Sequence, residues 1–214
     1  MARVETPSTG LASPGPDPSP EPSRCAWASG AFMQPYHDEE WGVPVHDDRR
    51  HFEFLVLESA QAGLSWITIL KRREAYKDAF CGFDPDAVAK LGPSDVERLV
   101  AESGIIRNRK KIESAIGNAR AFLEVRREFG SFDSYVWGFV NGLPIVNSWD
   151  AESKLPAETQ LSRDLSADLR RRGFRFLGPV VCYAQLQATG LVMDHVTGCF
   201  RWSELNRWNT PWVR

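Results

Sequence analysis

Helix-type spacing of apolar residues, opened repeatedly by capping residues, constrains this chain more than any other feature. Apolar side chains recur three and four positions apart, and Asp, Ser or Asn precedes the first turn of most of these stretches. The spacing predicts helices over residues 47–59, 94–104, 108–123, 131–140, 161–172 and 180–191. Clean two-residue alternation is absent, so we predict an all-α fold. The last segment is apolar nearly all round, which predicts the most buried helix.

The N-terminal residues differ in composition from the rest of the chain. Six prolines lie between positions 7 and 22, among serine, glycine and acidic residues, with almost nothing apolar to bury. Such a stretch cannot offset the entropy lost on ordering, so residues 1–23 are predicted to be a disordered tail. Residues 24–202 are predicted to form one domain, and residues 203–214 an irregular tail that carries tryptophans.

Charge and cysteine usage exclude several classes of protein. The net charge of −2 gives no overall attraction to nucleic acid, which leaves only a local basic patch for such contacts. No window approaches a membrane-spanning apolar run and no apolar leader opens the chain, so neither a membrane span nor export is expected. Four cysteines in such a chain favour reduced thiols or metal ligands, and a cytoplasmic location.

Two cysteines and two histidines stand near the two ends of the predicted domain. They are Cys25, His37, His195 and Cys199. Two thiolates and two imidazoles form a tetrahedral set that closes a structural zinc site. Spacing alone leaves open the alternative that the four are unrelated buried residues. The remaining cysteines, Cys81 and Cys182, have apolar neighbours and are predicted to belong to the core.

A carboxylate lies among apolar residues near a group of aromatics. Glu58 follows Leu55–Leu57 on the predicted helix 47–59. The nearby aromatics are Tyr36, Trp41 and Trp66. A carboxyl group in apolar surroundings is either paired or has a raised pKa, and aromatic faces beside it suit a flat cationic ligand. The alternative is that the tryptophans are core residues and that Glu58 is a solvated helix residue.

Two basic clusters lie at predicted turns. Four cations stand within residues 107–111, and four arginines within residues 170–175, around Gly173. A glycine turn into a helix N-terminus presents backbone N–H groups to a phosphate, and flanking arginines add affinity for a nucleic-acid backbone. The alternative is that these cations only complement helix dipoles. Two clusters on a near-neutral domain favour contact with DNA.

Several longer motifs, spread over about residues 24–200, are more specific than any single residue. They are Arg24–Trp27, Tyr36–Pro44, Leu57–Glu58, Gln61–Thr68, Gly104–Arg107, Ile116–Arg120, Arg172–Phe174, Gly190–Val192 and Asp194–Val196 before Cys199. In this order they resemble the 3-methyladenine DNA glycosylase I family, whose members excise N3-methylated adenine. The resemblance implies an all-α, helix-hairpin-helix glycosylase fold with a structural zinc that joins the N- and C-terminal segments.

The resemblance also implies a role for each candidate residue. The metal ligands, for one zinc per chain, are Cys25, His37, His195 and Cys199. The base-binding residues are Tyr36, Trp41, Trp66 and Glu58, of which Glu58 is the catalytic carboxylate. The DNA-binding residue that it implies is Gly178, in the hairpin that holds the backbone. From the two basic clusters we add Arg175 and Arg107 as DNA-binding residues.

Three details of the sequence refine these expectations. Met33 stands where family members often carry a tyrosine three positions before Tyr36, so a hydroxyl is missing from the pocket. No lysine lies within residues 177–183, where lyase members of the superfamily keep one, so we expect hydrolysis without a Schiff base. Asp194 is the rival catalytic carboxylate, but its neighbour His195 makes it a candidate to support the zinc ligands.

The resemblance therefore implies a monomer that acts on alkylated double-stranded DNA. It would hydrolyse the N-glycosidic bond of N3-methyladenine, releasing free 3-methyladenine and leaving an abasic site. A second hypothesis is a non-catalytic, zinc-containing sensor of alkylated bases. A third, a catalytic zinc hydrolase, is disfavoured because four protein ligands leave no open position for water.

Overall fold

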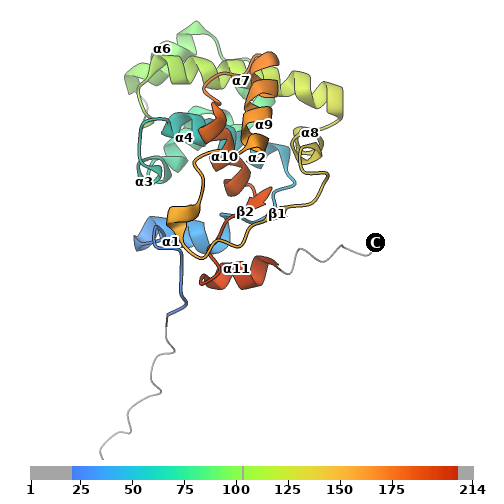
Figure 1. Ribbon diagram of the computed structural model, residues 1–214. Coiled ribbons are helices and arrows are strands. Elements are labelled where there is room, and N and C mark those ends of the chain that lie inside the picture. Colours follow the sequence, from blue (N-terminus) through green and yellow to red (C-terminus); the bar gives the residue numbers. More distant parts are fainter. Residues whose placement is uncertain (1–20, 103, 207–214) are drawn as a thin grey trace, which may run out of the picture.

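The computed structural model describes residues 21–102 and 104–206, most of which lie in helices (Figure 1). The α-helices are α1 (Gly30–Glu39), α2 (Asp48–Gln61), α3 (Trp66–Leu70), α4 (Arg73–Ala79), α5 (Pro85–Val88), α6 (Pro93–Glu102), α7 (Arg109–Phe129), α8 (Phe132–Gly138), α9 (Gln160–Arg171), α10 (Pro179–Ala188) and α11 (Phe200–Leu205). Two 3-10 turns are η1 (Cys81–Phe83) and η2 (Glu152–Lys154). A parallel pair of two-residue strands, β1 (Ile145–Val146) and β2 (Val192–Met193), was not predicted.

Side-chain caps start several helices where the sequence predicts them. The Asp47 carboxylate accepts the backbone N–H of Arg50 at the start of α2. Asn108 and Ser131 cap α7 and α8 in the same way. Each cap satisfies an N–H group that the first helical turn leaves unpaired. The structure is mostly helical, as an all-α prediction requires, and departs from that prediction in the short pair β1 and β2.

The start of α6 differs from the prediction. The helix begins at Pro93, one residue before the predicted range 94–104. A proline fits the first turn of a helix because its missing N–H would be unpaired there. The Asp95 carboxylate accepts the N–H of Gly92 and closes this turn. The helix predicted over residues 94–104 therefore starts one residue earlier than expected.

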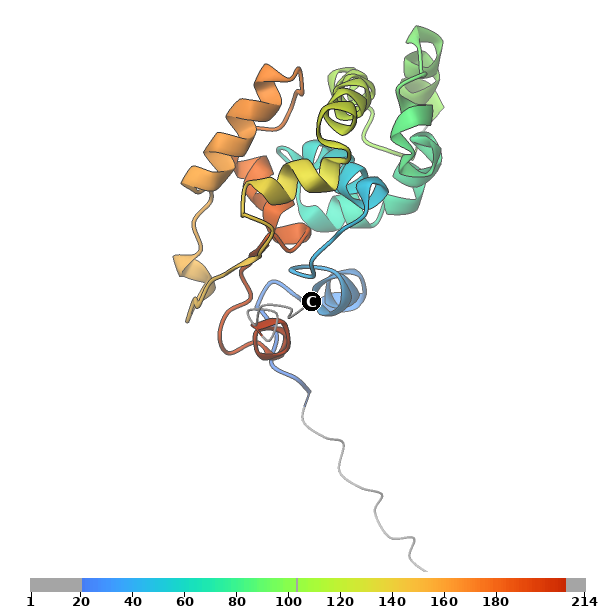
Figure 2. The ribbon, with the colours of Figure 1, turned by 90° about the vertical axis from the view of Figure 1, so that its right-hand side faces the viewer.

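The most buried helix is α2, not the helix predicted over residues 180–191. Ten successive side chains of α2, residues 51–60, are buried, because α2 packs against α7, α8 and α10. The predicted helix ends at Ala188, and Val180 in its first turn is 55% exposed. In Figure 2, α9 and the green helix α6 stand on opposite sides of the molecule, with the yellow-green α7 between them.

The first and last parts of the described chain meet at one end of the molecule, where α1 and α11 lie near each other (Figures 1 and 2). The N–H of Phe200 donates to the carbonyl of Ser23 at 2.9 Å. The N–H of Val45 donates to the carbonyl of Thr189 at 3.0 Å. The segment before α2 is thus fastened to the segment after α10.

The tightest approach between these two segments is at Gly190. Its φ is +71°, and a Cβ atom there would lie 2.4 Å from the carbonyl carbon of Val43 and from the nitrogen of Pro44. Both atoms belong to backbone, so neither can move aside without shifting the chain.

Gly190→Ala is expected to destabilise the protein by roughly 3 kcal/mol, because it adds a backbone clash to a left-handed φ. Urea denaturation measures the change in the free energy of unfolding. Gly138→Ala is the matched control, since Gly138 lies in α8 and no atom approaches its Cβ position within 4 Å. Equal stabilities of the two variants would contradict the close approach.

The predicted tails fall mostly outside the described residues. Residues 1–20 and 207–214 lie there, so the expectations for them are not tested. Residues 203–205 were predicted to be irregular but form the last turn of α11. Among the residues that the structure describes, no helix has the length and apolar character needed to cross a membrane.

Candidate active site and metal centre

A cavity of about 240 Å³ opens between α1, α2, α3 and α10. Its lining residues are Trp27, Met33, Tyr36, Trp41, Glu58, Gln61, Trp66, Ala184 and Gln187. The structure therefore brings together the carboxylate and all three aromatics that the sequence singled out, and Met33 lies on the wall as well.

Glu58 is the acidic group of this cavity. Its residue is 4% exposed, and among the described residues no donor hydrogen-bonds its carboxyl group. Desolvation alone raises the pKa of Glu58 to about 8. The prediction of a desolvated carboxyl is confirmed, and its alternative, a solvated helix residue, is excluded. A group of this kind favours a ligand that can donate hydrogen bonds to it.

Aromatic rings form most of the cavity wall. The rings of Tyr36 and Trp66 have centroids 5.3 Å apart, and those of Trp27 and Trp41 lie 5.0 Å apart in an edge-to-face arrangement. Burial and the nearby Glu58 raise the pKa of Tyr36 well above its ordinary value, so its hydroxyl stays a donor. Flat faces around one carboxyl suit the stacking of a planar ring.

An ion-pair network supports the helix that carries Tyr36. Glu40, which directly follows α1, accepts two hydrogen bonds from Arg73 at 2.8 Å and one from Arg50 at 2.6 Å. Glu53 of α2 pairs with the same two arginines. Because the four groups come from or adjoin α1, α2 and α4, they hold Tyr36 against the helix that carries Glu58.

The raised pKa of Glu58 makes a testable contribution to stability. The unfolded chain ionises this carboxyl near the ordinary glutamate pKa of 4.5, whereas the folded chain keeps it protonated up to about pH 8. Stability from this group is therefore present below pH 4.5 and is lost as pH rises toward 8. The variant Glu58→Gln cannot ionise at this position. Relative to it, the free energy of unfolding of the wild-type chain is expected to fall by about 1.4 kcal/mol per pH unit between pH 5.5 and 7.5. Urea denaturation of both proteins at several pH values measures this loss, and a constant difference between them would contradict the buried, unpaired state.

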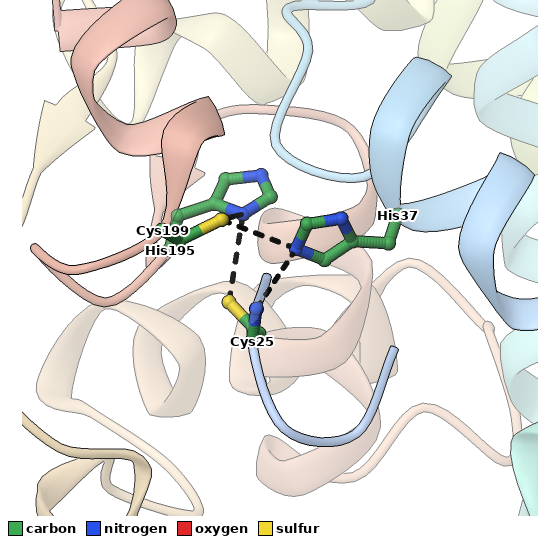
Figure 3. A group of neighbouring side chains, drawn as sticks. All are labelled: Cys25, His37, His195 and Cys199. Atoms are coloured by element: carbon green, nitrogen blue, oxygen red, sulfur yellow. Dashed lines mark hydrogen bonds between the residues drawn. The ribbon is translucent and has the colours of Figure 1, made fainter. Parts of the chain in front are cut away.

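The predicted metal ligands form a second, adjacent cluster (Figure 3). Cys25, His37, His195 and Cys199 are all buried, and their ligand atoms lie within 4.8 Å of one another. The Cys199 sulfur lies 3.4 Å from Nε2 of His37 and 3.6 Å from Nδ1 of His195. Zinc bonds of about 2.3 Å to sulfur and 2.0 Å to nitrogen, at a tetrahedral angle, place these atoms roughly 3.5 Å apart. The cluster can therefore hold a metal ion.

The surroundings of the two imidazoles leave one nitrogen of each facing the cluster. Nδ1 of His37 is hydrogen-bonded to the Asp38 carboxylate at 2.7 Å, and Nε2 of His195 is hydrogen-bonded to the carbonyl of Trp41 at 2.9 Å. These partners favour the tautomers in which the opposite nitrogen carries a lone pair. Hydrogen bonds from the Cys25 thiol and from both imidazoles lower the pKa of Cys199. The lower pKa favours the thiolate form, which is the form that binds metals.

Asp194 does not support the ligands as we predicted. Its carboxylate accepts hydrogen bonds from Asn147, Trp149, Tyr183 and Gln187. The carboxylate that holds a ligand imidazole is Asp38, which Arg24 in turn holds with two bonds to Oδ2 at 2.8 and 2.9 Å. Adjacency in the sequence misled the prediction, because the hydrogen-bond partner of the His195 ring outside the cluster is the carbonyl of Trp41.

A methyladenine glycosylase family model matches residues 27–202. The chain belongs to the methyladenine glycosylase family. It is 50% identical over 177 residues to DNA-3-methyladenine glycosylase 1 of Escherichia coli, a match that covers 82% of this chain and 95% of that protein. The suspected resemblance is confirmed.

Solved structures of methyladenine glycosylases share the fold. A crystal structure of a 3-methyladenine DNA glycosylase I is 48% identical, with a TM-score of 0.81, and covers 83% of this chain and 98% of that one. The enzyme from Staphylococcus aureus, solved to explain its recognition of 3-methyladenine, is 38% identical with a TM-score of 0.80. That match covers 82% of this chain and 94% of the S. aureus chain.

In this member of the methyladenine glycosylase family, a tight hairpin joins α9 to α10. Gly178 directly precedes α10, and Phe176 is 40% exposed with a φ of +58°. The buried side chain of Asn118 donates to the carbonyl of Arg175 at 3.0 Å and accepts its N–H at 2.8 Å. The hairpin backbone is therefore fixed from α7, while its tip faces solvent.

The predicted basic residues divide into paired and unpaired groups. Lys111 donates to the carbonyls of Ala60 and Ala62 at the end of α2, so it caps a helix, as the alternative interpretation held. Arg109, Arg171 and Arg172 are bound to carboxylates. Within the described residues, Arg107 and Arg175 are exposed and have no acidic partner.

Several residues of the site were missed from the sequence, and one other residue was misplaced. The missed lining residues are Trp27, Gln61, Ala184 and Gln187. Gln61 could have been found, because it lies three residues after Glu58 on the same helix. Cys182 is buried as predicted, but Cys81 is exposed, because it begins the turn η1 at the surface with a φ of +53°.

Proposed function

We propose that this chain hydrolyses the N-glycosidic bond of N3-methyladenine in alkylated double-stranded DNA. Membership of the family makes it a glycosylase, a hydrolase of N-glycosyl bonds. The observation that carries the proposal is the unpaired, buried Glu58 inside a cavity walled by aromatic rings. The relatives named for 3-methyladenine support the choice of base. The catalytic unit in this proposal is a monomer spanning residues 24–202.

Recognition of the base follows from its charge. N3 methylation makes the purine cationic and weakens the bond to the sugar, so the leaving base needs no further proton. Extruding the nucleotide costs a few kcal/mol, and stacking on aromatic side chains such as Tyr36 and Trp66 returns about 1–3 kcal/mol per base. The positive charge of the bound base lowers the raised pKa of Glu58 again and so favours its ionised form. That carboxylate then accepts a hydrogen bond from the exocyclic amine of the cation. Neutral adenine would desolvate the same carboxylate with less compensation, which discriminates against it.

The reaction is proposed to end at an abasic site. Water attacks the sugar carbon as the base leaves. The products are free 3-methyladenine and an uncut strand with one abasic site. No lysine occurs within residues 177–183 to form a Schiff base with that sugar. To test this, a methylated duplex is incubated with the protein, and the sample is then split into two halves, one of which is treated with alkali. Strands cut only after alkali support a monofunctional hydrolase, whereas strands cut without alkali contradict it.

A structural zinc is proposed for the Cys2His2 cluster. Cys25 and His37 would hold it from the start of the domain, and His195 and Cys199 from its end. The ion would supply a cross-link between the two ends and no chemistry at the base. His37 directly follows Tyr36, and the ring of His195 is hydrogen-bonded to the carbonyl of Trp41. The cross-link would therefore position both of these aromatic residues in the cavity wall.

The hairpin is proposed to contact the DNA backbone. The first turn of α10 leaves backbone N–H groups free for a phosphate, next to Gly178. Arg175 and Arg107, both exposed and without acidic partners among the described residues, would add contacts to phosphates.

Arg175→Ala is expected to weaken duplex binding at all sequences and to lower the slope of log affinity against log salt by about 0.9. Fluorescence anisotropy at several salt concentrations measures that slope. Arg127→Ala is the control, since Arg127 is exposed and already bound to Glu124. An unchanged slope in Arg175→Ala would remove this residue from the DNA interface.

A further inference from the structure

Gln187 lies on the cavity wall with its side-chain amide held in one orientation. Its Nε2 donates to Oδ2 of Asp194 at 2.7 Å. A carboxylate only accepts hydrogen bonds, so the amide nitrogen faces Asp194. The carbonyl oxygen Oε1 sits on the same carbon and must point away from Asp194. Gln187 thus presents a hydrogen-bond acceptor, Oε1, on the side that faces away from Asp194.

Asp194 cannot turn to release this amide. The residue is 1% exposed, and its Oδ1 accepts from Nδ2 of Asn147 and from Nε1 of Trp149, both at 2.7 Å. The hydroxyl of Tyr183 donates to Oδ2 at 2.5 Å. An indole N–H is always a donor, so Oδ1 is an acceptor whatever the other hydrogen positions are. Three donors other than Gln187 therefore fix the carboxylate, and the carboxylate fixes Gln187.

The remaining oxygen of Gln187 has no partner of its own. Among the described residues, no donor hydrogen-bonds Oε1, and Oε1 is not one of the fully buried atoms that lack a partner. Gln187 itself lines the cavity. Glu58 of α2 lines the same cavity, and α2 packs against α10. A ligand there meets two groups able to accept hydrogen bonds, one from each helix. Such a pair suits an amine, which has two N–H bonds to donate.

We propose that Gln187 is a specificity-determining residue, whose Oε1 accepts an N–H bond from the exocyclic amine of the bound base, and that Asp194 is its positioning residue. The inference rests on the proposed function, since it concerns the base in the same cavity. A purine with an oxo group in place of that amine would place its oxygen next to Oε1 of Gln187, where two acceptors repel each other and no hydrogen bond forms. The pair Gln187–Asp194 therefore selects N3-methylated adenine over its oxo analogue.

The experiment compares two free bases, 3-methyladenine and 3-methylhypoxanthine, which carry an amine and an oxo group at the same carbon. Calorimetry gives the ratio of their affinities for each protein. Gln187→Met keeps the length of the side chain but removes the acceptor, and is expected to lower the preference for 3-methyladenine about tenfold. Gln160→Met, on an exposed part of α9, is expected to keep the wild-type ratio.

Asp194→Asn provides a second test through the positioning residue. A carboxamide can meet either end of the Gln187 amide, so Gln187 can then turn its NH₂ group to the cavity. The preference is expected to fall in Asp194→Asn, and to fall no further when Gln187→Met is added. A wild-type ratio in folded Gln187→Met overturns the inference and leaves the proposed function standing. If the wild-type protein binds neither base, the proposed function is overturned and the inference with it.

Discussion

Cys199→Ser is expected to lower the free energy of unfolding by about 5 kcal/mol or more, the largest stability effect that we expect from a single substitution. Structural zinc supplies roughly 10–16 kcal/mol in small peptides, and a whole domain is stable by only about 5–15 kcal/mol. Serine is a poor zinc ligand at neutral pH, so the cross-link between α1 and the start of α11 would open. Urea denaturation measures the loss, and metal analysis is expected to find one zinc per wild-type chain.

Cys81→Ser is the matched control for this prediction. Cys81 is exposed and lies outside the cluster, so the same chemical change there is expected to stay within about 0.5 kcal/mol. A chelator is expected to lower the stability of the wild-type protein to that of Cys199→Ser and to leave the variant unchanged. The proposal of a structural metal fails if Cys199→Ser is as stable and as rich in zinc as Cys81→Ser.

Glu58→Gln is expected to bind free 3-methyladenine about 10- to 100-fold more weakly than the wild-type protein. A hydrogen bond to a charged group contributes about 1.5–3 kcal/mol, and the glutamine amide keeps the shape of the side chain without its charge. Calorimetry gives the affinity directly. The same variant is expected to be the more stable protein at neutral pH, so a loss of binding cannot be assigned to unfolding.

Glu74→Gln serves as the control for the lost charge. Glu74 lies on α4 with a side chain that is 81% exposed, so its replacement is expected to leave the affinity unchanged. An unchanged affinity in Glu58→Gln would show that this carboxyl neither recognises nor stabilises the base. It would leave the aromatic wall as the only basis for recognition.

The local rules of helix formation account for what the sequence predicted well. Asp47, Asn108 and Ser131 start helices because each side chain satisfies a backbone N–H three residues later, a rule that needs no tertiary information. Two thiolates and two imidazoles suggested a zinc site from residue types, but left open four unrelated buried residues. The resemblance to a family decided between the two. That the site joins the two chain ends came from the same resemblance.

What the sequence could not predict depends on contacts between distant segments. Gln187 is one of two glutamines in a mainly apolar helix, and only the fold brings it to Asp194 and to the cavity of Glu58. Cys81 has apolar neighbours in the sequence, but a surface turn exposes it. The two-residue strands β1 and β2 are too short for alternation to be seen, because their pairing is set by segments almost fifty residues apart.

The most direct test of the central claim is chromatography of the bases that the purified protein releases from methylated duplex DNA. We expect each protein molecule to release 3-methyladenine many times, with 7-methylguanine left in the duplex, and we expect Glu58→Gln to lose that release. Folded, zinc-loaded protein that releases no base would contradict this expectation. The cavity would then bind an alkylated base without cleaving it, as a sensor does.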